Sequence, residues 1–196
     1  MIAELFKETP PSPEALEELK RVNAIDECVA RGDVAEFAKL VDRKEVAGAG
    51  LDGYLLRAVA AGHTDLMLHC LEGRSLCEAT VVAAVDTAIG RERTAVLREL
   101  LRRFHLRHCA GRFQYRFIGA LMRSNLVIAE MLQKVFGYGT SVLNWGAAAA
   151  AACGKKDSVV WLFAVGADDI RRAAGEAEWM GHGTLARQIL VANNPS

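Results

Sequence analysis

The sequence lacks a long hydrophobic run and an excess of charge of either sign. Its longest apolar run, residues 147–153, is far shorter than the roughly 18 residues that a membrane-spanning helix needs, so no membrane partner is expected. Lys plus Arg and Asp plus Glu both number 24, and the net charge is zero. No global field therefore points to nucleic acid or to a membrane surface.

Proline is also scarce, and the cysteines show no framework spacing. Five cysteines make an odd number, which argues against a disulfide scaffold. The first 13 residues lack the charged head, apolar run and cleavage site of a secretory signal. The predicted compartment is the reducing cytoplasm, with the nucleus as the alternative. Four prolines against 17 glycines suit short helices separated by glycine turns.

A pattern of paired helices recurs along the chain. An apolar helix ends near a glycine, a few polar residues follow, and a second helix carries paired apolar positions. The clearest copies are residues 55–71 and 147–166. The expected turns between the paired helices are Gly32, Gly62, Gly90, Ser124, Gly154 and Gly181. Their spacings, close to 30 residues, predict a stack of helix pairs, since one pair cannot cover its own apolar face.

Alignment on the turns brings small and aliphatic residues into register. Seven positions before the turn stand Ile25, Leu55, Ala83, Phe117, Ala147 and Ala174. Eight positions after it stand Leu40, Cys70, Arg98, Leu132, Leu162 and Ile189. Four positions before the turn the other copies carry Cys28, Ala58, Ala120, Ala150 and Ala177. The copy at Gly90 breaks the pattern with Asp86 at that position and with Arg98 in its second helix. A two-residue insertion at this turn would bring the apolar pairs 96–97 and 100–101 of the second helix into register, but it would not repair the first helix.

These residues resemble the ankyrin repeat. The stretch 60–63 (Ala-Ala-Gly-His), followed by apolar pairs at 66–67 and 70–71, is similar to the second half of that repeat, and residues 165–168 are similar to its Gly-Ala-Asp ending. The family's Thr-Pro-Leu-His opening is absent. The resemblance implies an all-α solenoid of about six stacked ankyrin-like repeats, with a concave face that binds a partner. Such proteins rarely carry catalysis.

The chain ends set the expected boundaries. Ser12 is expected as an N-cap and Pro13 as the first helical residue. Residues 14–22 are expected to form an N-terminal cap helix. The predicted organisation is an N-terminal extension (1–13), a single ankyrin-like repeat domain (14–192) and a C-terminal tail (193–196).

Candidate catalytic and metal-ligating residues are few. His105, His108 and Cys109 offer three ligands within five residues, but no second Cys/His pair follows at zinc spacing. Solvated or capping histidines are therefore the favoured interpretation. No phosphate loop, nucleophile elbow or carboxylate pair occurs. The sequence predicts no metal, no cofactor and no enzymatic activity.

An arginine cluster is the strongest charge feature. Its members are Arg91, Arg93, Arg98, Arg102, Arg103, Arg107, Arg112 and Arg116. The first interpretation is a solvated helix face, balanced by acidic residues near the amino terminus. The second is a site for an acidic protein. The third is a site for nucleic acid or a phosphorylated ligand, bound through guanidinium contacts.

The ankyrin register also predicts a binding surface on the first helix of each pair. Its expected residues are Tyr54, Arg57, Arg116, Met122, Arg123 and Trp179. Tyr, Trp, Arg and Met are enriched at the centres of interfaces. Trp179 is the best single anchor, although a core position in the last repeat explains it equally well. The predicted function is a protein–protein interaction module or adaptor. The alternative is a binder of nucleic acid or phosphorylated ligand through residues 91–116, and the oligomeric state is left open.

Overall fold

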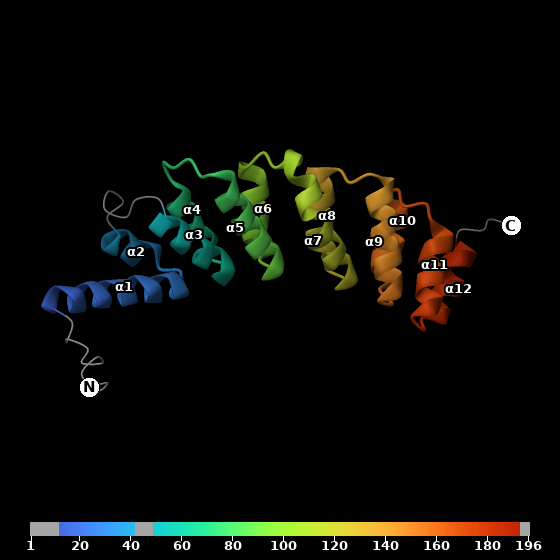
Figure 1. Cartoon of the computed structure of the whole chain (residues 1–196), viewed down its shortest axis with the longest axis horizontal. Helices are drawn as coiled ribbons and strands as arrows, with labels where there is room; N and C mark the ends of the chain where they lie inside the picture. Colours follow the sequence, from blue (N-terminus) through green and yellow to red (C-terminus); the bar gives the residue numbers. More distant parts are fainter. Residues whose placement is uncertain (1–11, 42–48, 193–196) are drawn as a thin grey trace, which may run out of the picture. The chain divides into compact units, whose positions relative to one another are not determined.

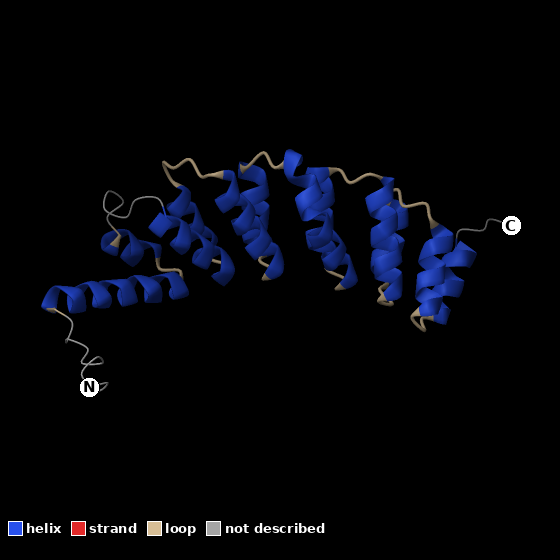
Figure 2. Cartoon of the chain, in the orientation of Figure 1, coloured by secondary structure: helices blue, strands red, loops and turns tan. Residues whose placement is uncertain are grey.

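The computed structural model describes residues 12–41 and 49–192 of the chain. It is all-helical, with 80% helix, twelve α-helices and no strand in the described ranges (Figure 2). The expected all-α class is confirmed. No helix in these ranges is long and apolar enough to cross a membrane. Most of the predicted extension, residues 1–11, and the predicted tail, 193–196, lie outside the described residues.

The chain divides into two compact units, Met1–Thr80 and Val81–Ser196, and each is described by itself. Unit 1 holds α1 (Pro13–Arg31), α2 (Val34–Leu40), α3 (Ala49–Ala61) and α4 (Thr64–Leu71). Helix α1 packs on α2 and α3, and α3 packs on α4 (Figure 1). The described part of unit 1 therefore consists of two helix pairs.

The start of α1 follows from its sequence. The Ser12 hydroxyl accepts a hydrogen bond from the Ala15 N–H at 3.2 Å, and Pro13 occupies the first turn. Residues 14–22 are helical as expected, but they do not form a helix of their own, because α1 continues without a break to Arg31. No glycine or proline interrupts the helix, and its second half carries buried Ile25 and Cys28. The cap and the first repeat helix are therefore one element.

The described part of unit 2 contains four further helix pairs and one short 3₁₀ helix. Its elements are α5 (Glu78–Gly90, which begins at the end of unit 1), α6 (Thr94–Arg103), η1 (Arg107–Cys109), α7 (Ala110–Met122), α8 (Leu126–Phe136), α9 (Thr140–Ala152), α10 (Lys156–Ala164), α11 (Ile170–Trp179) and α12 (Gly183–Ala192). The first helices α7, α9 and α11 pack one against the next, and each packs on the second helix of its own pair (Figure 1).

The turns inside the six helix pairs share a left-handed residue. Positive φ angles occur at Gly32, Gly62, Glu92, Ser124, Gly154 and Gly181. The expected turn at Gly90 is wrong, because Gly90 is the last residue of α5 and Glu92 takes the left-handed conformation with φ 57°. A residue with a Cβ adopts that conformation at a cost of roughly 1–2 kcal/mol.

Moving the turn to Glu92 removes the irregularity of this repeat in both of its helices. Val85 and Ala88 now take the expected buried positions of the first helix, and Leu100 takes that of the second. All three are fully buried. The two-residue shift therefore restores the whole repeat rather than its second helix alone.

Small residues let the first helices of unit 2 approach closely. Ala147, Ala150 and Ala151 of α9 are fully buried. A Cβ added to Gly146 would lie 2.9 Å from Cδ1 of Leu121, which packs from α7. The buried Ser158 hydroxyl also donates to the Leu121 carbonyl at 2.8 Å. The Ala-rich run of residues 147–152 is therefore helical and largely buried.

A histidine packs against a turn glycine of the preceding pair in both units. In unit 1, a Cβ on Gly32 would lie 2.5 Å from Nδ1 of His63, whose Nε2 is 2.9 Å from the Ala30 carbonyl oxygen. In unit 2, a Cβ on Gly154 would lie 2.8 Å from Cε1 of His182. Both histidines directly follow the turn glycine of their own pair. The same histidine–glycine contact between successive helix pairs therefore occurs in both units.

Replacing Gly32 by alanine is expected to cost more stability than replacing Gly73. Both glycines are left-handed, with φ of 73° and 67°, but only Gly32 lies against a side chain. Each substitution carries a backbone strain of roughly 1–2 kcal/mol. Gly32→Ala also displaces His63 from Ala30, which adds about 1 kcal/mol. Urea unfolding of both variants measures the difference, and equal losses would show that the histidine contact contributes nothing.

Candidate interaction surface

Large apolar side chains lie exposed on the first helices of unit 2. Tyr115 of α7 is 66% exposed, and its ring meets Trp145 of α9 edge-on, with centroids 5.1 Å apart. Met122 of α7 is 40% exposed and Trp179 of α11 is 85% exposed. These three exposed residues, together with the half-buried Trp145, are called the aromatic stripe below. Exposed aromatic and Met side chains of this kind are typical of binding surfaces.

The register explains why Tyr115, Met122 and Trp179 are exposed, whereas Trp145 is half-buried. Tyr115 and Met122 are seven residues apart, which is close to two helical turns, so they lie on one face of α7. Trp145 precedes the turn at Gly154 by as many residues as Tyr115 precedes Ser124. Trp179 lies two residues before the turn residue Gly181, and Met122 likewise lies two residues before the turn residue Ser124. The stripe residues therefore occupy equivalent positions, counted from the turn, in successive helix pairs.

Trp179 is not a core residue of the last repeat. The core of α11 consists of Ala173, Ala174 and Ala177, whereas Trp179 and the adjacent Met180 project into solvent. Of the two explanations that the sequence left open for Trp179, the structure excludes the buried one.

Both predicted arginines of unit 2 are held by acids of the preceding helix pair. Arg116 donates to both carboxylate oxygens of Asp86, at 2.8 and 2.6 Å. This contact raises the pKa of Arg116. Arg123 donates to Glu92 at 3.3 Å. Both guanidinium groups remain about half exposed, but part of their hydrogen-bonding capacity is used inside the unit.

The two predicted residues of unit 1 also make contacts within their unit. Tyr54 is half-buried, with its ring edge-on to Phe37 at a centroid distance of 5.6 Å. Burial is the main reason that the pKa of Tyr54 is raised. Arg57 donates a hydrogen bond to the carboxylate of Asp26 on α1. Tyr54 therefore offers only part of its surface to a partner.

The predicted set of six binding residues differs from the surface that the structure shows. Within unit 2 the structure groups Arg116 and Met122 on α7, with Arg123 at its end, and it leaves Trp179 exposed on α11. The sequence analysis missed Tyr115 and Trp145, which the equal distances from their turns could have revealed. A partner role for the six predicted residues stays a prediction.

Part of the arginine cluster is neutralised locally. Glu99 of α6 accepts from Arg102 at 2.7 Å and from Arg103 at 2.8 Å. These hydrogen bonds lower the pKa of Glu99 to about 2. In contrast, Arg91, Arg98, Arg107 and Arg112 have no ion-pair partner among the described residues. The cluster is therefore split into paired and unpaired cations.

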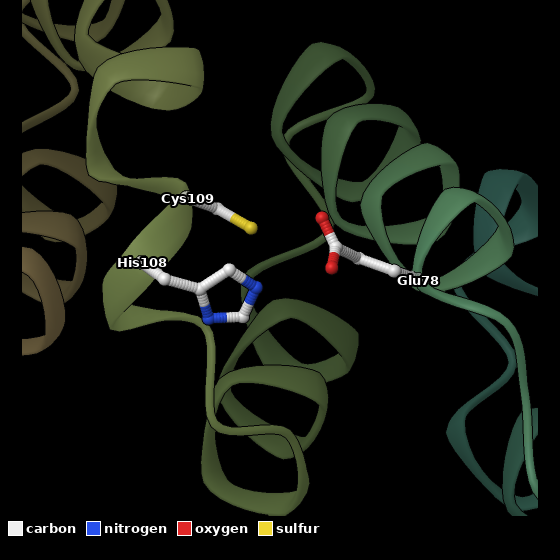
Figure 3. Close-up of side chains that lie close together, drawn as sticks. All are labelled: Glu78, His108 and Cys109. Atoms are coloured by element: carbon white, nitrogen blue, oxygen red, sulfur yellow. The ribbon is translucent and has the colours of Figure 1, made fainter.

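The histidine and cysteine ligands considered from the sequence lie around η1. Figure 3 shows the side chains of His108 and Cys109 leaving η1 toward the same side. Glu78, also drawn there, is the first residue of α5 and belongs to unit 1. Within unit 2, His108 and Cys109 supply two ligands, whereas a structural zinc needs four. We assign no metal to this pair.

Comparisons with protein-family models, with curated proteins and with solved structures find no match for the chain.

The Asp86–Arg116 pair is expected to contribute little to stability. A double-mutant cycle with Asp86→Asn and Arg116→Gln should give a coupling of at most about 1 kcal/mol, because both groups are well exposed. Denaturant unfolding of the two single variants and the double variant measures it. A coupling several times larger would mean that the pair holds α5 and α7 together.

The Glu99 carboxylate is expected to stay ionised well below its ordinary pKa of 4.5. Since the folded pKa is depressed, the contribution to stability is present above pH 4.5. It is lost as the pH falls toward about 2. An NMR titration of the Glu99 side-chain carboxyl carbon measures the midpoint. Arg102→Gln combined with Arg103→Gln should move that midpoint up toward 4.5, and an unchanged midpoint would contradict the assignment.

Proposed function

We propose that the chain is an array of six ankyrin-like helix-pair repeats that binds another protein through the first helices of unit 2. The ankyrin-like character is supported by the left-handed turn residue that recurs in all six pairs. It is further supported by the His63–Gly32 and His182–Gly154 contacts, which recur at the same repeat position. The packing of α7, α9 and α11 one on the next is what stacked repeats require.

The observation that carries the binding proposal is the aromatic stripe. Alanines and glycine fill the contact between α9 and its neighbours, whereas Tyr115 stays 66% exposed beside the half-buried Trp145. Trp179 has even less structural use, at 85% exposure. Exposed aromatic side chains on rigid helices lose little conformational entropy on binding, which favours them as interface anchors.

A binding protein is favoured over an enzyme because the stripe has the residue types of an interface and Tyr115 is its only titratable member. Tyr, Trp and Met side chains supply contact area, whereas acid–base catalysis needs titratable groups placed at a reacting atom. The charged groups beside the stripe on and at the end of α7, Arg116 and Arg123, already pair with Asp86 and Glu92. They suit the polar rim of an interface.

Replacing Trp179 is expected to weaken partner binding while leaving the fold intact. An interface anchor of this type contributes about 2 kcal/mol or more, equivalent to roughly 30-fold in affinity. A photo-cross-linking amino acid at position 179 identifies the partner in an extract of the source cells. Titration of the purified partner against Trp179→Ala then measures the loss.

Val191→Ala is the matched control, because Val191 is also strongly exposed, at 76%, but lies on the second helix α12. The control should retain full affinity, and circular dichroism should show unchanged thermal unfolding for both variants. Equal affinity of wild type and of Trp179→Ala and Tyr115→Ala variants would refute the role of the stripe.

A further inference from the structure

A basic pocket opens in unit 2 away from the aromatic stripe. It lies between α6, the segment that leads through η1, and α8, and its volume is about 780 Å³. This lies within the roughly 300–1,000 Å³ of typical ligand pockets. The stripe residues belong to α7, α9 and α11 instead. The pocket therefore lies on helices other than those that carry the stripe.

The charged residues that line the pocket are all basic. They are Arg98 and Arg102 of α6, Arg107 of η1 and Lys134 of α8. No acidic side chain is among the lining residues. Arg102 is partly neutralised by Glu99, but Arg98, Arg107 and Lys134 have no ion-pair partner within the described ranges. Three unpaired cations around one hollow form a local positive field, although the whole chain is neutral.

The remaining lining of the pocket is largely apolar. Leu101 and Leu106 are buried beneath it, and Met131 and Val135 contribute half-buried side chains from α8. A ligand that fits must present negative charge at the rim and apolar surface toward this floor. Inorganic anions satisfy only the first requirement, and a neutral apolar ligand satisfies only the second.

We propose that this pocket binds an acidic peptide segment of a partner protein, with an aliphatic side chain on the apolar floor and carboxylates against the surrounding cations. Guanidinium groups recognise carboxylates through paired, charge-assisted hydrogen bonds, which suits Arg98 and Arg107. Lys134 adds a cation from the facing helix α8. The assignment does not depend on the aromatic stripe, so either surface can fail a test without the other.

A peptide fits this lining better than a nucleic acid does. Nucleic-acid surfaces pair cations with aromatic side chains that stack on bases. Here the floor is aliphatic, with Phe104 the one aromatic ring among the lining residues other than the histidines. A sugar–phosphate backbone has no branched apolar group to place against Leu101, Leu106 and Val135.

The test uses the full chain and a fluorescein-labelled peptide with two central leucines and glutamates on both sides, followed by fluorescence anisotropy. Binding should fall by about tenfold or more when glutamines replace the glutamates, and also when alanines replace the leucines. The Arg98→Glu/Lys134→Glu variant should lose at least as much. Both residues are exposed, so circular dichroism should show unchanged folding.

Arg91→Glu/Arg112→Glu is the matched control. These arginines are exposed and unpaired among the described residues, belong to the same cluster, and do not line the pocket. The control carries the same change of charge and should bind within about twofold of wild type.

Four results would overturn the proposal. The first is undiminished binding by the pocket variant, and the second is an equal loss in the control. The third is tighter binding of a single-stranded oligonucleotide than of the peptide, which would favour nucleic acid. The fourth is a change of oligomeric state in the pocket variant on sedimentation, which would mean that a second copy of the chain occupies the pocket.

Discussion

Close contact between neighbouring first helices is the constraint on which unit 2 depends. A single helix pair cannot cover its own apolar face, so each pair must lie against the next. Gly146 leaves room for Leu121 from the preceding pair, and the buried alanines of α9 keep that approach possible along the helix. A larger side chain at these positions would push α7 and α9 apart and weaken every contact between them.

This constraint also decides where the aromatic residues go. Phe113 and Phe117 of α7 are buried, and Phe117 packs on Tyr138 with centroids 4.7 Å apart. The small residues between the first helices leave no such space for Tyr115 or Trp179. These rings therefore remain at the surface, where they supply contact area for a partner at little cost to the fold.

The packing of the helix pairs also decides which cations of unit 2 are paired with acids. Arginines on or at the end of α7 reach acids of the preceding helix pair, as Arg116 reaches Asp86. Among the described residues, Arg98 and Lys134 beside the pocket between α6 and α8 have no ion-pair partner, although Arg102 there pairs with Glu99. A chain with no net charge thus presents a local cationic site, because acidic residues form ion pairs with arginines elsewhere in the unit.

Much of the fold could be predicted from local pattern. The cap at Ser12, the turns at Gly62 and Gly154 and the buried positions Leu55 and Phe117 follow from spacing and residue type, and all are confirmed. The predicted turn at Gly90 is wrong because Glu92, although it carries a Cβ, adopts the left-handed conformation there. Leu40 is only half-buried because Phe37 fills the core of α2.

What the sequence determined by itself is the helical class and the repeating turn, because both depend on residues within one or two helical turns of each other. The tertiary structure alone decided that Trp179 is exposed, that Arg116 is paired and that Arg98 and Lys134 border one pocket. These outcomes depend on residues about one repeat apart, such as Arg116 and Asp86. Their proximity is set by how the helix pairs pack and by which side chain reaches an acid first.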